Sequence, residues 1–416
     1  MEQISMFDYW KSPLKIDKPI RLIELFAGIG SQAKALQRLG ANFEHYRICE
    51  FDKYAVNSYN AIHGTNFATS DITQISADDL GIVDTDKYCY IMTYSFPCQD
   101  LSLAGKQKGM AKGENTRSGL LWEVERLLNE CDPLPQVLLM ENVTQVHGKN
   151  NIENFIKWMQ FLESIGYSNY WQDLNSKNFG IPQNRDRTFM VSILGDYTYE
   201  FPEEFPLKLR LKDMLEDSVD DKFYLSDKII SFFTENTKKQ QAKGNGFKFQ
   251  PTDGSGCGKA ITTRAGGRMD DNFIIEQPKL DVAFNLYEEG VKGFNRNTGE
   301  VLKTSGLCNT IQTMQGGNRQ PKIVEPLALD EQNGYIRKCG TVGTLTTDGS
   351  SPKHNNRVIV GEKVRKLTPK ECWRLMGFDD ADFEKASIVN SNSQLYKQAG
   401  NSIVVDVLYY LFKQML

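Results

Sequence analysis

The chain has 416 residues, 40% hydrophobic and 25% charged, an ordinary composition for a folded globular protein with one large or two moderate cores. No run approaches the roughly 18 apolar residues that a membrane helix needs, and the N-terminus lacks the apolar core of a signal peptide. We therefore expect no membrane partner and a cytoplasmic location. The eight cysteines form no CxxC pair and histidines number only four, so neither a metal site nor a disulfide framework is expected.

The net charge of −4 does not by itself favour a polyanionic partner. The distribution of charge is more informative, because the segment 237–268 contains many cations and a single acid, Asp253. The cations of this segment are Lys238, Lys239, Lys243, Lys248, Lys259, Arg264 and Arg268. Such a stretch on an acidic protein indicates either a nucleic-acid contact or a solvated lysine face.

Between residues 20 and 200, short apolar runs alternate with helical patterns. Strands are predicted at 20–26, 46–49, 88–92, 137–140 and 188–194, and helices at 31–39, 53–63, 120–129 and 152–165. Ser31 is available as a cap for the first helix. Alternating strands and helices are typical of a mostly parallel sheet that is covered by helices on both faces.

The composition of the chain changes after Pro206, and Gly, Thr, Asn and short β-rich runs dominate until about residue 360. Three similar units occur, in which a Thr-rich strand precedes a glycine loop and a second apolar run; their Thr-rich parts are 260–263, 310–313 and 344–347. The repeat predicts either a small β domain or polar loops that enter a DNA groove. Helix returns at 366–372, with Thr368 as N-cap, Pro369 at the first position and Glu371 three residues after the cap, and at 404–416.

A glycine loop follows the first strand and opens the first helix: Phe26, Ala27, Gly28, Ile29 and Gly30. Glycines let the backbone turn sharply and approach a ligand. Glu50 ends the second strand, where an acid usually binds ribose hydroxyls, and Phe51 is suited to stack on an adenine. Asp71 and Ile72 are candidates for the adenine edge. The loop lacks the GxGxxG pattern, so a nucleoside without a pyrophosphate, such as S-adenosylmethionine, is favoured over a dinucleotide.

Cys98 follows the predicted strand at 88–92 and lies next to Pro97 and Gln99. A thiolate in a polarised, partly open loop is a nucleophile, although a lone cysteine at a strand end is also an ordinary core residue. Glu141 ends the strand 137–140, and Arg185 and Arg187 alternate along a strand, so that both arginines share one face. Each of these charged residues is equally typical of a strand edge in solvent.

The motifs appear in a specific order along the chain: Phe26-Ala27-Gly28-Ile29-Gly30, Glu50, Asp71, Pro97-Cys98-Gln99, Glu141-Asn142-Val143, Gln183-Asn184-Arg185-Asp186-Arg187 and Gln398-Ala399-Gly400-Asn401-Ser402. This series resembles the DNA (cytosine-5) methyltransferase family of bacterial type. The resemblance covers roughly 20–200 and 364–416. The segment 206–362 falls where the family has its variable target-recognition region, and only its position is similar.

The resemblance implies that Cys98 adds to carbon 6 of a flipped-out cytosine and that carbon 5 then takes a methyl group from S-adenosyl-L-methionine. Glu141 would hold ring nitrogen 3 and Arg187 the cytosine O2. Arg185 would hold the Cys98 loop or a phosphate, and Asn142 the neighbouring backbone or the exocyclic amine. The cofactor residues expected are Phe26, Ala27, Gly28, Ile29, Gly30, Glu50, Phe51, Asp71, Ile72, Pro97, Leu121, Asn401 and Ser402. The DNA contacts expected are Gln99, Ser102, Lys106, Lys108, Thr263, Arg264, Arg268, Thr313, Gln315 and Thr347.

The expected fold is therefore an α/β, Rossmann-like S-adenosylmethionine-dependent methyltransferase core with a smaller, mainly β target-recognition domain. The expected divisions are an N-terminal extension (1–19), a catalytic and cofactor-binding domain (20–205), a target-recognition domain (206–362), and a hinge with a C-terminal helix that returns to the catalytic domain (363–416). We expect a monomer that acts on double-stranded DNA in a restriction-modification or phage/host protection system, with or without a cognate restriction endonuclease. A tRNA cytosine-5 methyltransferase with the same core is the main alternative. A catalytically inactive DNA-binding module and a nicotinamide dehydrogenase fit the motifs less well.

Overall fold

The computed structural model describes residues 12–97, 117–244, 246–276 and 363–416, and the backbone of five short strands between 282 and 337. The chain divides into two compact units. Unit 1 contains Met1–Phe223, Asp227–Phe273 and Lys366–Leu416, and unit 2 contains Tyr224–Ser226 and Ile274–Arg365. Among the described residues, no helix has the length and apolar character that crossing a membrane requires.

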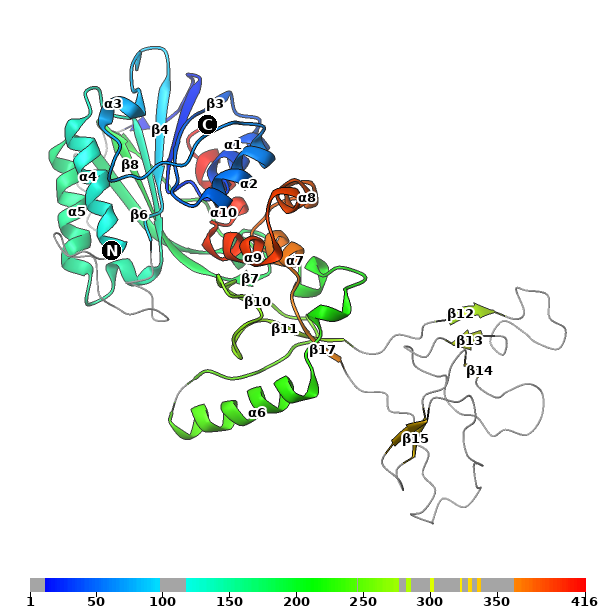
Figure 1. Ribbon diagram of the computed structural model, residues 1–416. Coiled ribbons are helices and arrows are strands. Elements are labelled where there is room, and N and C mark those ends of the chain that lie inside the picture. The colour runs from blue at the N-terminus through cyan, green and yellow to red at the C-terminus, as the bar shows by residue number, and fades with distance from the viewer. Residues whose placement is uncertain are drawn as a thin grey trace. The chain divides into compact units, whose positions relative to one another are not determined.

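Unit 1 is built on a six-stranded sheet with the order β3-β2-β4-β5-β8-β6 (Figure 1). Its strands are β2 (Ile20–Leu25), β3 (Phe43–Cys49), β4 (Cys89–Tyr94), β5 (Val137–Asn142), β6 (Tyr167–Asn175) and β8 (Asp186–Leu194). The pairs from β3 to β5 are parallel, whereas β8 is antiparallel to both β5 and β6. The predicted parallel sheet is thus confirmed for four strands. The sequence analysis did not predict β6, because its polar residues interrupt the apolar pattern.

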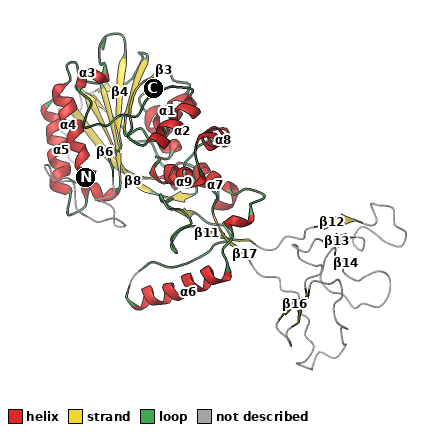
Figure 2. Cartoon of the chain, in the orientation of Figure 1, coloured by secondary structure: helices red, strands yellow, loops and turns green. Residues whose placement is uncertain are grey.

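Helices cover both faces of this sheet (Figures 1 and 2). The helices α4 (Leu121–Glu130) and α5 (Ile152–Ser164) lie on one face, and α1 (Ser31–Leu39), α2 (Lys53–His63) and α10 (Val405–Lys413) lie on the other. The shorter or peripheral helices are α3 (Ala77–Leu80), α6 (Asp227–Ala242), α7 (Pro369–Arg374), α8 (Asp380–Val389) and α9 (Asn392–Asn401). The bounds of α1 and α2 agree with the prediction residue for residue, because glycines end both helices as left-handed C-caps at Gly40 and Gly64.

The central strands and the two helices on one face of the sheet, α4 and α5, share a hydrophobic core. Ile23, Met92 and Leu138 are fully buried on the central strands, and Leu127 and Trp158 are fully buried on α4 and α5. Apolar side chains on both sides of a parallel strand make its sequence nearly continuous in hydrophobic residues. This explains why the short runs in the sequence located the central strands.

Two local expectations are wrong. Ser31 does not cap α1: the N-cap is Gly30, with a left-handed backbone and no side-chain cap, and Ser31 is the first helical residue. In the first repeat, the expected strand at 260–263 is instead a turn region, and β10 (Gly258–Lys259) pairs in parallel with β7 (Gln183–Asn184). The chain returns as β11 (Phe273–Glu276), so the described part of this repeat is not a simple hairpin.

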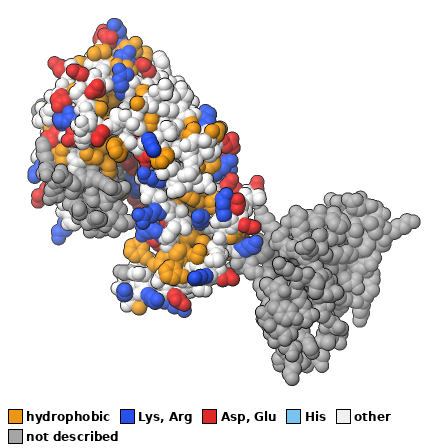
Figure 3. Space-filling view, in the orientation of Figure 1, with side chains coloured by type: hydrophobic (Ala, Val, Ile, Leu, Met, Phe, Trp, Pro, Cys, Tyr) orange, Lys and Arg blue, Asp and Glu red, His pale blue; other side chains and the backbone are white. Residues whose placement is uncertain are grey.

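The segment after residue 206 also contains helix, which the sequence analysis did not predict. None of the residues of α6 is buried, and Phe232 is 59% exposed. Figure 3 shows hydrophobic side chains gathered over this part of the surface, with Lys and Arg side chains among them. Phe233 on the same helix contacts Phe249 and Phe273, so only one edge of the helix is anchored.

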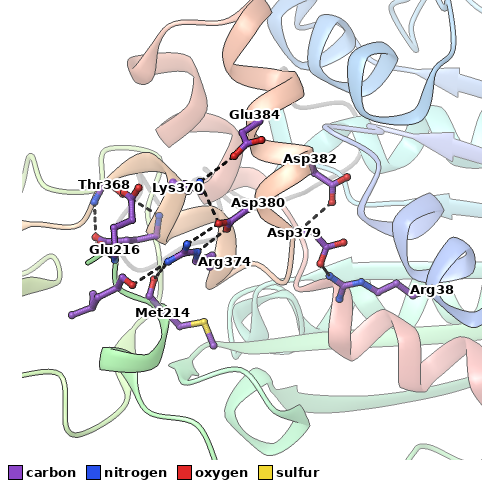
Figure 4. A network of polar contacts seen from close by, with 12 residues as sticks. Arg38, Met214, Glu216, Thr368, Lys370, Arg374, Asp379, Asp380, Asp382 and Glu384 are labelled. Carbon is purple, nitrogen blue, oxygen red and sulfur yellow. Dashed lines mark hydrogen bonds and ion pairs between the residues drawn. The ribbon is translucent and has the colours of Figure 1, made fainter. Parts of the chain in front are cut away.

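The C-terminal segment is held to the first helix by ion pairs (Figure 4). Lys34 Nζ lies 2.8 Å from Asp382 Oδ2, and Arg38 Nη2 lies 2.8 Å from Asp379 Oδ1. Thr368 caps α7 as predicted: its side chain accepts from Glu371 N, and Glu371 accepts from Thr368 N. Residues far apart in the sequence thus form one body in unit 1.

The described part of unit 2 consists mainly of short strands. β12 (Val282–Asn285) is antiparallel to β13 (Glu300–Leu302), which is parallel to β14 (Lys322–Ile323). β15 (Ala328–Asp330) and β16 (Tyr335–Arg337) form an antiparallel pair. Glu276 accepts hydrogen bonds from Tyr224 and Arg365, the latter on β17 (Lys363–Lys366). A further two-residue pair, β1 (Ser12–Pro13) with β9 (Tyr197–Thr198), belongs to unit 1.

Candidate active site

The glycine loop and Glu50 lie together at the carboxyl ends of β2 and β3. Phe26, Gly28 and Gly30 all have positive φ, and Phe26 N donates to the carbonyl of Cys49 at 2.7 Å. The Glu50 carboxylate accepts from Gly28 N at 2.9 Å and from Asp52 N at 2.8 Å. Burial raises the pKa of Glu50, and these two backbone hydrogen bonds oppose the rise. The loop therefore presents a turned backbone beside an acceptor that is already oriented.

The remaining predicted cofactor residues divide into two groups. Phe51 is 77% exposed next to Glu50, and Ser70 N donates to the Glu50 carbonyl at 2.9 Å, which brings Asp71 to the same strand end. By contrast, Ile72 and Leu121 are buried in the hydrophobic core. A ligand could therefore reach little more than their backbone atoms.

Glu141 and Arg187 form an ion pair at the end of the sheet where β5 finishes and β8 begins. Arg187 Nε lies 3.1 Å from Glu141 Oε1, and both side chains are largely buried. Burial raises the pKa of Glu141, and the charges of Arg187 and Arg185, with the Ser95 hydroxyl, partly offset the rise. A carboxyl group in this setting holds a proton more readily than one in water, as a proton donor requires.

Two side chains fix the segment that leads out of β4. Asn142 Nδ2 donates to the carbonyl of Phe96 at 3.0 Å, and its Oδ1 accepts from Val143 N at 2.9 Å. Ser118 Oγ donates to the carbonyl of Pro97 at 2.7 Å. Cys98 is the next residue and lies outside the described residues. Both polar atoms of the Asn142 side chain thus bind backbone groups.

Arg185 binds backbone carbonyls from two distant segments. Its guanidinium donates to Ile261 O at 3.1 Å, to Gly400 O at 3.3 Å and to Ser402 O at 2.8 Å. The side chain is buried at 4% exposure. Arg185 thus joins the start of β8 to the region after β10 and to the end of α9. The expected contact of Arg185 with the Cys98 loop would involve residues outside the described ones and stays a prediction.

Gln183 reinforces the same junction. Its Oε1 accepts from Ile261 N at 2.9 Å, and its Nε2 donates to Leu375 O at 2.6 Å. A Cβ atom on Gly400 would lie 2.3 Å from Thr263 N, so the two backbones are in direct contact there. We name Gln183, Arg185, Ile261 and Gly400 the backbone junction.

Comparison with known proteins decides the family. The sequence model of the family described as "C-5 cytosine-specific DNA methylase" matches residues 20–416. The chain belongs to this family. It is a DNA (cytosine-5)-methyltransferase that uses S-adenosyl-L-methionine. The family that the motifs predicted is thus confirmed.

Curated relatives and solved structures resemble nearly the whole methyltransferase chain. It is 31% identical to Type II methyltransferase M2.ScrFI of Lactococcus lactis subsp. cremoris, over 95% of this chain and 99% of the relative. It is 34% identical to Orphan methyltransferase M.SssI of Spiroplasma monobiae, over 94% and 96%. The structure of the Entamoeba histolytica methyltransferase EhMeth aligns with a TM-score of 0.61 at 15% identity, over 96% of this chain and 98% of that one, and supports the expected fold.

The described residues fit S-adenosylmethionine. An ideal Cβ on Gly28 would meet no atom of the described residues within 4 Å, so within the described part of the chain the loop has room for a ligand on that side. The oriented Glu50 carboxylate is an acceptor for ribose hydroxyls, and the exposed Phe51 ring offers a face for an adenine. In the last motif, Ser402 Oγ donates to Gln398 O at 2.7 Å and Asn401 is exposed.

The predicted DNA contacts are only partly within the described residues. Thr263 and Arg264 are exposed beside the backbone junction, whereas Arg268 pairs with Asp270 at 3.1 Å. The other predicted contacts lie outside the described residues, as does the nucleophile: Cys98, Gln99, Ser102, Lys106, Lys108, Thr313, Gln315 and Thr347.

The contacts of Gln183 and Ser118 were not predicted from the sequence. Gln183 was quoted within the motif 183–187 without a role, and its position two residues before Arg185 was the available signal. Ser118 had no signal, because its hydrogen bond to Pro97 depends on how the segment between them returns to the sheet.

Proposed function

We propose that the chain methylates carbon 5 of a flipped-out cytosine in a specific sequence of double-stranded DNA, through a covalent bond between Cys98 and carbon 6. The observation that carries the proposal is the Glu141–Arg187 ion pair. It lies at the end of β5, beside the end of β4 from which the chain continues to Cys98. A nucleophile, an acid and an anion-stabilising cation are what the reaction needs at one place.

The Cys98 thiolate adds to carbon 6, and the electron pair of the 5,6 double bond moves into the ring. Glu141 donates a proton or a hydrogen bond to nitrogen 3, and Arg187 stabilises the charge at O2. Carbon 5 thereby becomes an enamine-like nucleophile. Free cysteine is only a few per cent thiolate at neutral pH, so proton transfer accompanies the attack or precedes it.

Held by the glycine loop and Glu50, S-adenosylmethionine would supply the methyl group to carbon 5, with cleavage of the methyl–sulfonium bond and release of S-adenosylhomocysteine. A base then removes the proton from carbon 5, and the carbon 6–sulfur bond breaks, so that the thiolate leaves and the aromatic ring returns. The cytosine must leave the duplex for this attack, at a cost of a few kcal/mol in unstacking. The segment 102–115, with lysines at 106, 108 and 112, is the expected cover of the flipped base and lies outside the described residues.

We assign target recognition to 206–362 and catalysis to 20–205, with 1–19 as an extension and 363–416 as the hinge and closing helix. The basic segment 237–268 and the exposed Thr263 and Arg264 support DNA contact in the first part of the recognition region. We further propose a cytoplasmic monomer. It would act in a restriction-modification or phage/host protection system, because one relative is named a type II and another an orphan methyltransferase.

Trapping the enzyme on modified DNA tests the mechanism. A duplex containing 5-fluorocytosine cannot lose a proton from carbon 5, so the native enzyme should remain covalently attached in the presence of S-adenosylmethionine. The variant Cys98→Ser should form no adduct. An adduct that still forms would reject Cys98 as the nucleophile.

Bisulfite sequencing of an expressing host tests the substrate and the specificity. We expect 5-methylcytosine in DNA at one short sequence. Modification confined to tRNA would favour the alternative substrate. Grafting 206–362 onto a related core should transfer the methylated sequence, and an unchanged sequence would reject the assignment of this region.

A further inference from the structure

A buried polar pair lies directly behind the glycine loop. Glu24 on β2 is 1% exposed, and Tyr59 on α2 is fully buried. Tyr59 Oη donates to Glu24 Oε2 at 2.5 Å, and Glu24 Oε1 accepts from Ala33 N at 3.4 Å. Ala33 is in the first turn of α1, whose N-cap Gly30 offers no side chain. Glu24 therefore supplies from β2 the acceptor that a local cap would otherwise provide.

His63, the last residue of α2, holds the loop at its centre. His63 Nε2 lies 3.1 Å from the carbonyl of Ile29, and since a carbonyl only accepts, Nε2 carries the proton. Burial, followed by the nearby His45, lowers the pKa of His63 to about 3, so the ring is neutral. The hydrogen bond to Ile29 therefore joins two neutral groups, and the His63 ring does not change its charge near pH 7.

Helix α2 and the loop are packed without a gap. A Cβ on Gly30 would lie 2.3 Å from His63 Nε2 and 2.7 Å from Tyr59 Cε2. A Cβ on Gly28 would have no neighbour among the described residues within 4 Å. The loop is thus supported tightly on the side of α2 and open on the side of Gly28.

We propose that Glu24, Tyr59 and His63 are positioning residues for S-adenosylmethionine. They fix the backbone of the glycine loop and the first turn of α1 in the binding conformation without touching the cofactor. The inference rests on the proposed assignment of the cofactor to this loop. A loop that is ordered before binding loses less entropy when the ligand arrives, so loosening it weakens affinity.

The variant Tyr59→Phe tests the inference by removing one hydroxyl. The dissociation constant for S-adenosylmethionine is measured by calorimetry on the full chain without DNA. The Tyr59 hydroxyl donates to Glu24 and also lies 3.0 Å from His45 Nδ1. Each such hydrogen bond is worth about 0.5–1.5 kcal/mol, so losing the one to Glu24 should weaken binding at least about 2- to 10-fold. Tyr167→Phe is the matched control, because Tyr167 is also buried and its Oη donates to Pro135 O at 2.6 Å, away from the loop. This control should bind as the native chain does.

His63 gives a second, independent readout. His63→Gln retains an N–H donor for the Ile29 carbonyl and should keep most of the affinity for S-adenosylmethionine. His63→Leu has no such donor, so its affinity for S-adenosylmethionine should fall. A purely structural role would lower the melting temperature of both variants and leave the affinity of the folded protein unchanged. Unchanged affinity in folded Tyr59→Phe and His63→Leu overturns the inference.

Glu50→Ala separates this failure from that of the cofactor assignment. If Glu50→Ala also binds as the native chain does, the cofactor does not occupy this loop and the proposed site is wrong. If Glu50→Ala alone weakens binding, the loop binds the cofactor but the network behind it does not position it.

Discussion

Arg187 Nε and Glu141 Oε1 lie 3.1 Å apart, on antiparallel strands at the edge of the sheet where β4 also ends. Burial raises the pKa of this carboxyl group while the arginine opposes the rise. The two effects leave a carboxyl that can hold a proton near a cation. In the mechanism that we propose, Glu141 donates to nitrogen 3 and Arg187 stabilises charge at O2 of the same cytosine.

Removing the acid should slow methyl transfer without affecting cofactor binding. In Glu141→Gln, the carboxyl can no longer donate a proton, and general acid catalysis is worth about 10²- to 10⁴-fold. We expect the single-turnover rate to fall by at least about 100-fold, with the affinity for S-adenosylmethionine unchanged. Glu153→Gln, an exposed residue in the first turn of α5, is the control. A rate within a few-fold of the native value would contradict the role of Glu141.

Stability should depend on pH through Glu24. Burial raises its pKa from 4.5 to about 7, against the hydrogen bonds from Tyr59 and Ala33. Between these values the folded state keeps a proton that the unfolded state releases, so the free energy of unfolding falls as pH rises from about 4.5 to 7. The loss amounts to about 3 kcal/mol at most.

Glu24→Gln isolates this contribution, because the amide does not ionise. Urea denaturation at pH 5, 6, 7 and 8 should show the native chain losing stability relative to the variant as pH rises. Other titrating groups are common to both proteins and cancel in the difference. Parallel curves would mean that Glu24 does not change its proton affinity on folding.

The elements that sequence analysis placed best are those whose signals are local. Helices α1 and α2 end at glycines, and α7 begins with the predicted cap at Thr368, so each boundary is set by neighbouring residues. The parallel strands are recognisable because both of their faces are buried. The motif order was sufficient to name the family before any distance was known.

What the sequence could not supply depends on contacts between distant segments. Gly30 leaves α1 without a side-chain cap, and the replacement, Glu24, comes from another element. Arg185 was expected to hold the Cys98 loop or a phosphate, and its carbonyl partners at Ile261 and Gly400, 76 and 215 residues away, were not predicted. Helix α6 was missed because it buries no apolar face, so its pattern resembles that of a polar loop.

Ser118 should contribute to covalent capture. Its hydroxyl holds the carbonyl of the peptide bond that precedes Cys98, at 2.7 Å. Losing one such hydrogen bond in Ser118→Ala costs about 1 kcal/mol of positioning, so the rate of adduct formation on a 5-fluorocytosine duplex should fall about 5-fold. DNA affinity should not change.

Ser164→Ala is the control for Ser118→Ala, because Ser164 Oγ also donates to a backbone carbonyl, that of Phe161 at 2.6 Å, and lies at the C-terminus of α5. Equal rates of adduct formation in the two variants would show that the Ser118 hydroxyl has no special effect on Cys98.

The backbone junction should be intolerant of a side chain at position 400. A Cβ there would lie 2.3 Å from Thr263 N and 2.4 Å from Thr262 C, and these are backbone atoms that cannot rotate away. Gly400→Ala must move α9 or the turn at 262–263, and overpacking of this kind costs about 1–3 kcal/mol. Because Thr263 and Arg264 are exposed on that turn, DNA binding should weaken together with stability, whereas the Glu50 end of the site is unaffected.

Denaturant unfolding and DNA titration of Gly400→Ala measure the two effects separately. Gly256→Ala is the control, since a Cβ at this glycine meets no atom within 4 Å. The control should change the unfolding free energy by less than about 1 kcal/mol and leave DNA affinity intact. If Gly400→Ala is as stable as the control and binds DNA equally well, the turn at 262–263 does not rest on α9, and the hydrogen bonds of Arg185 cannot fix its position.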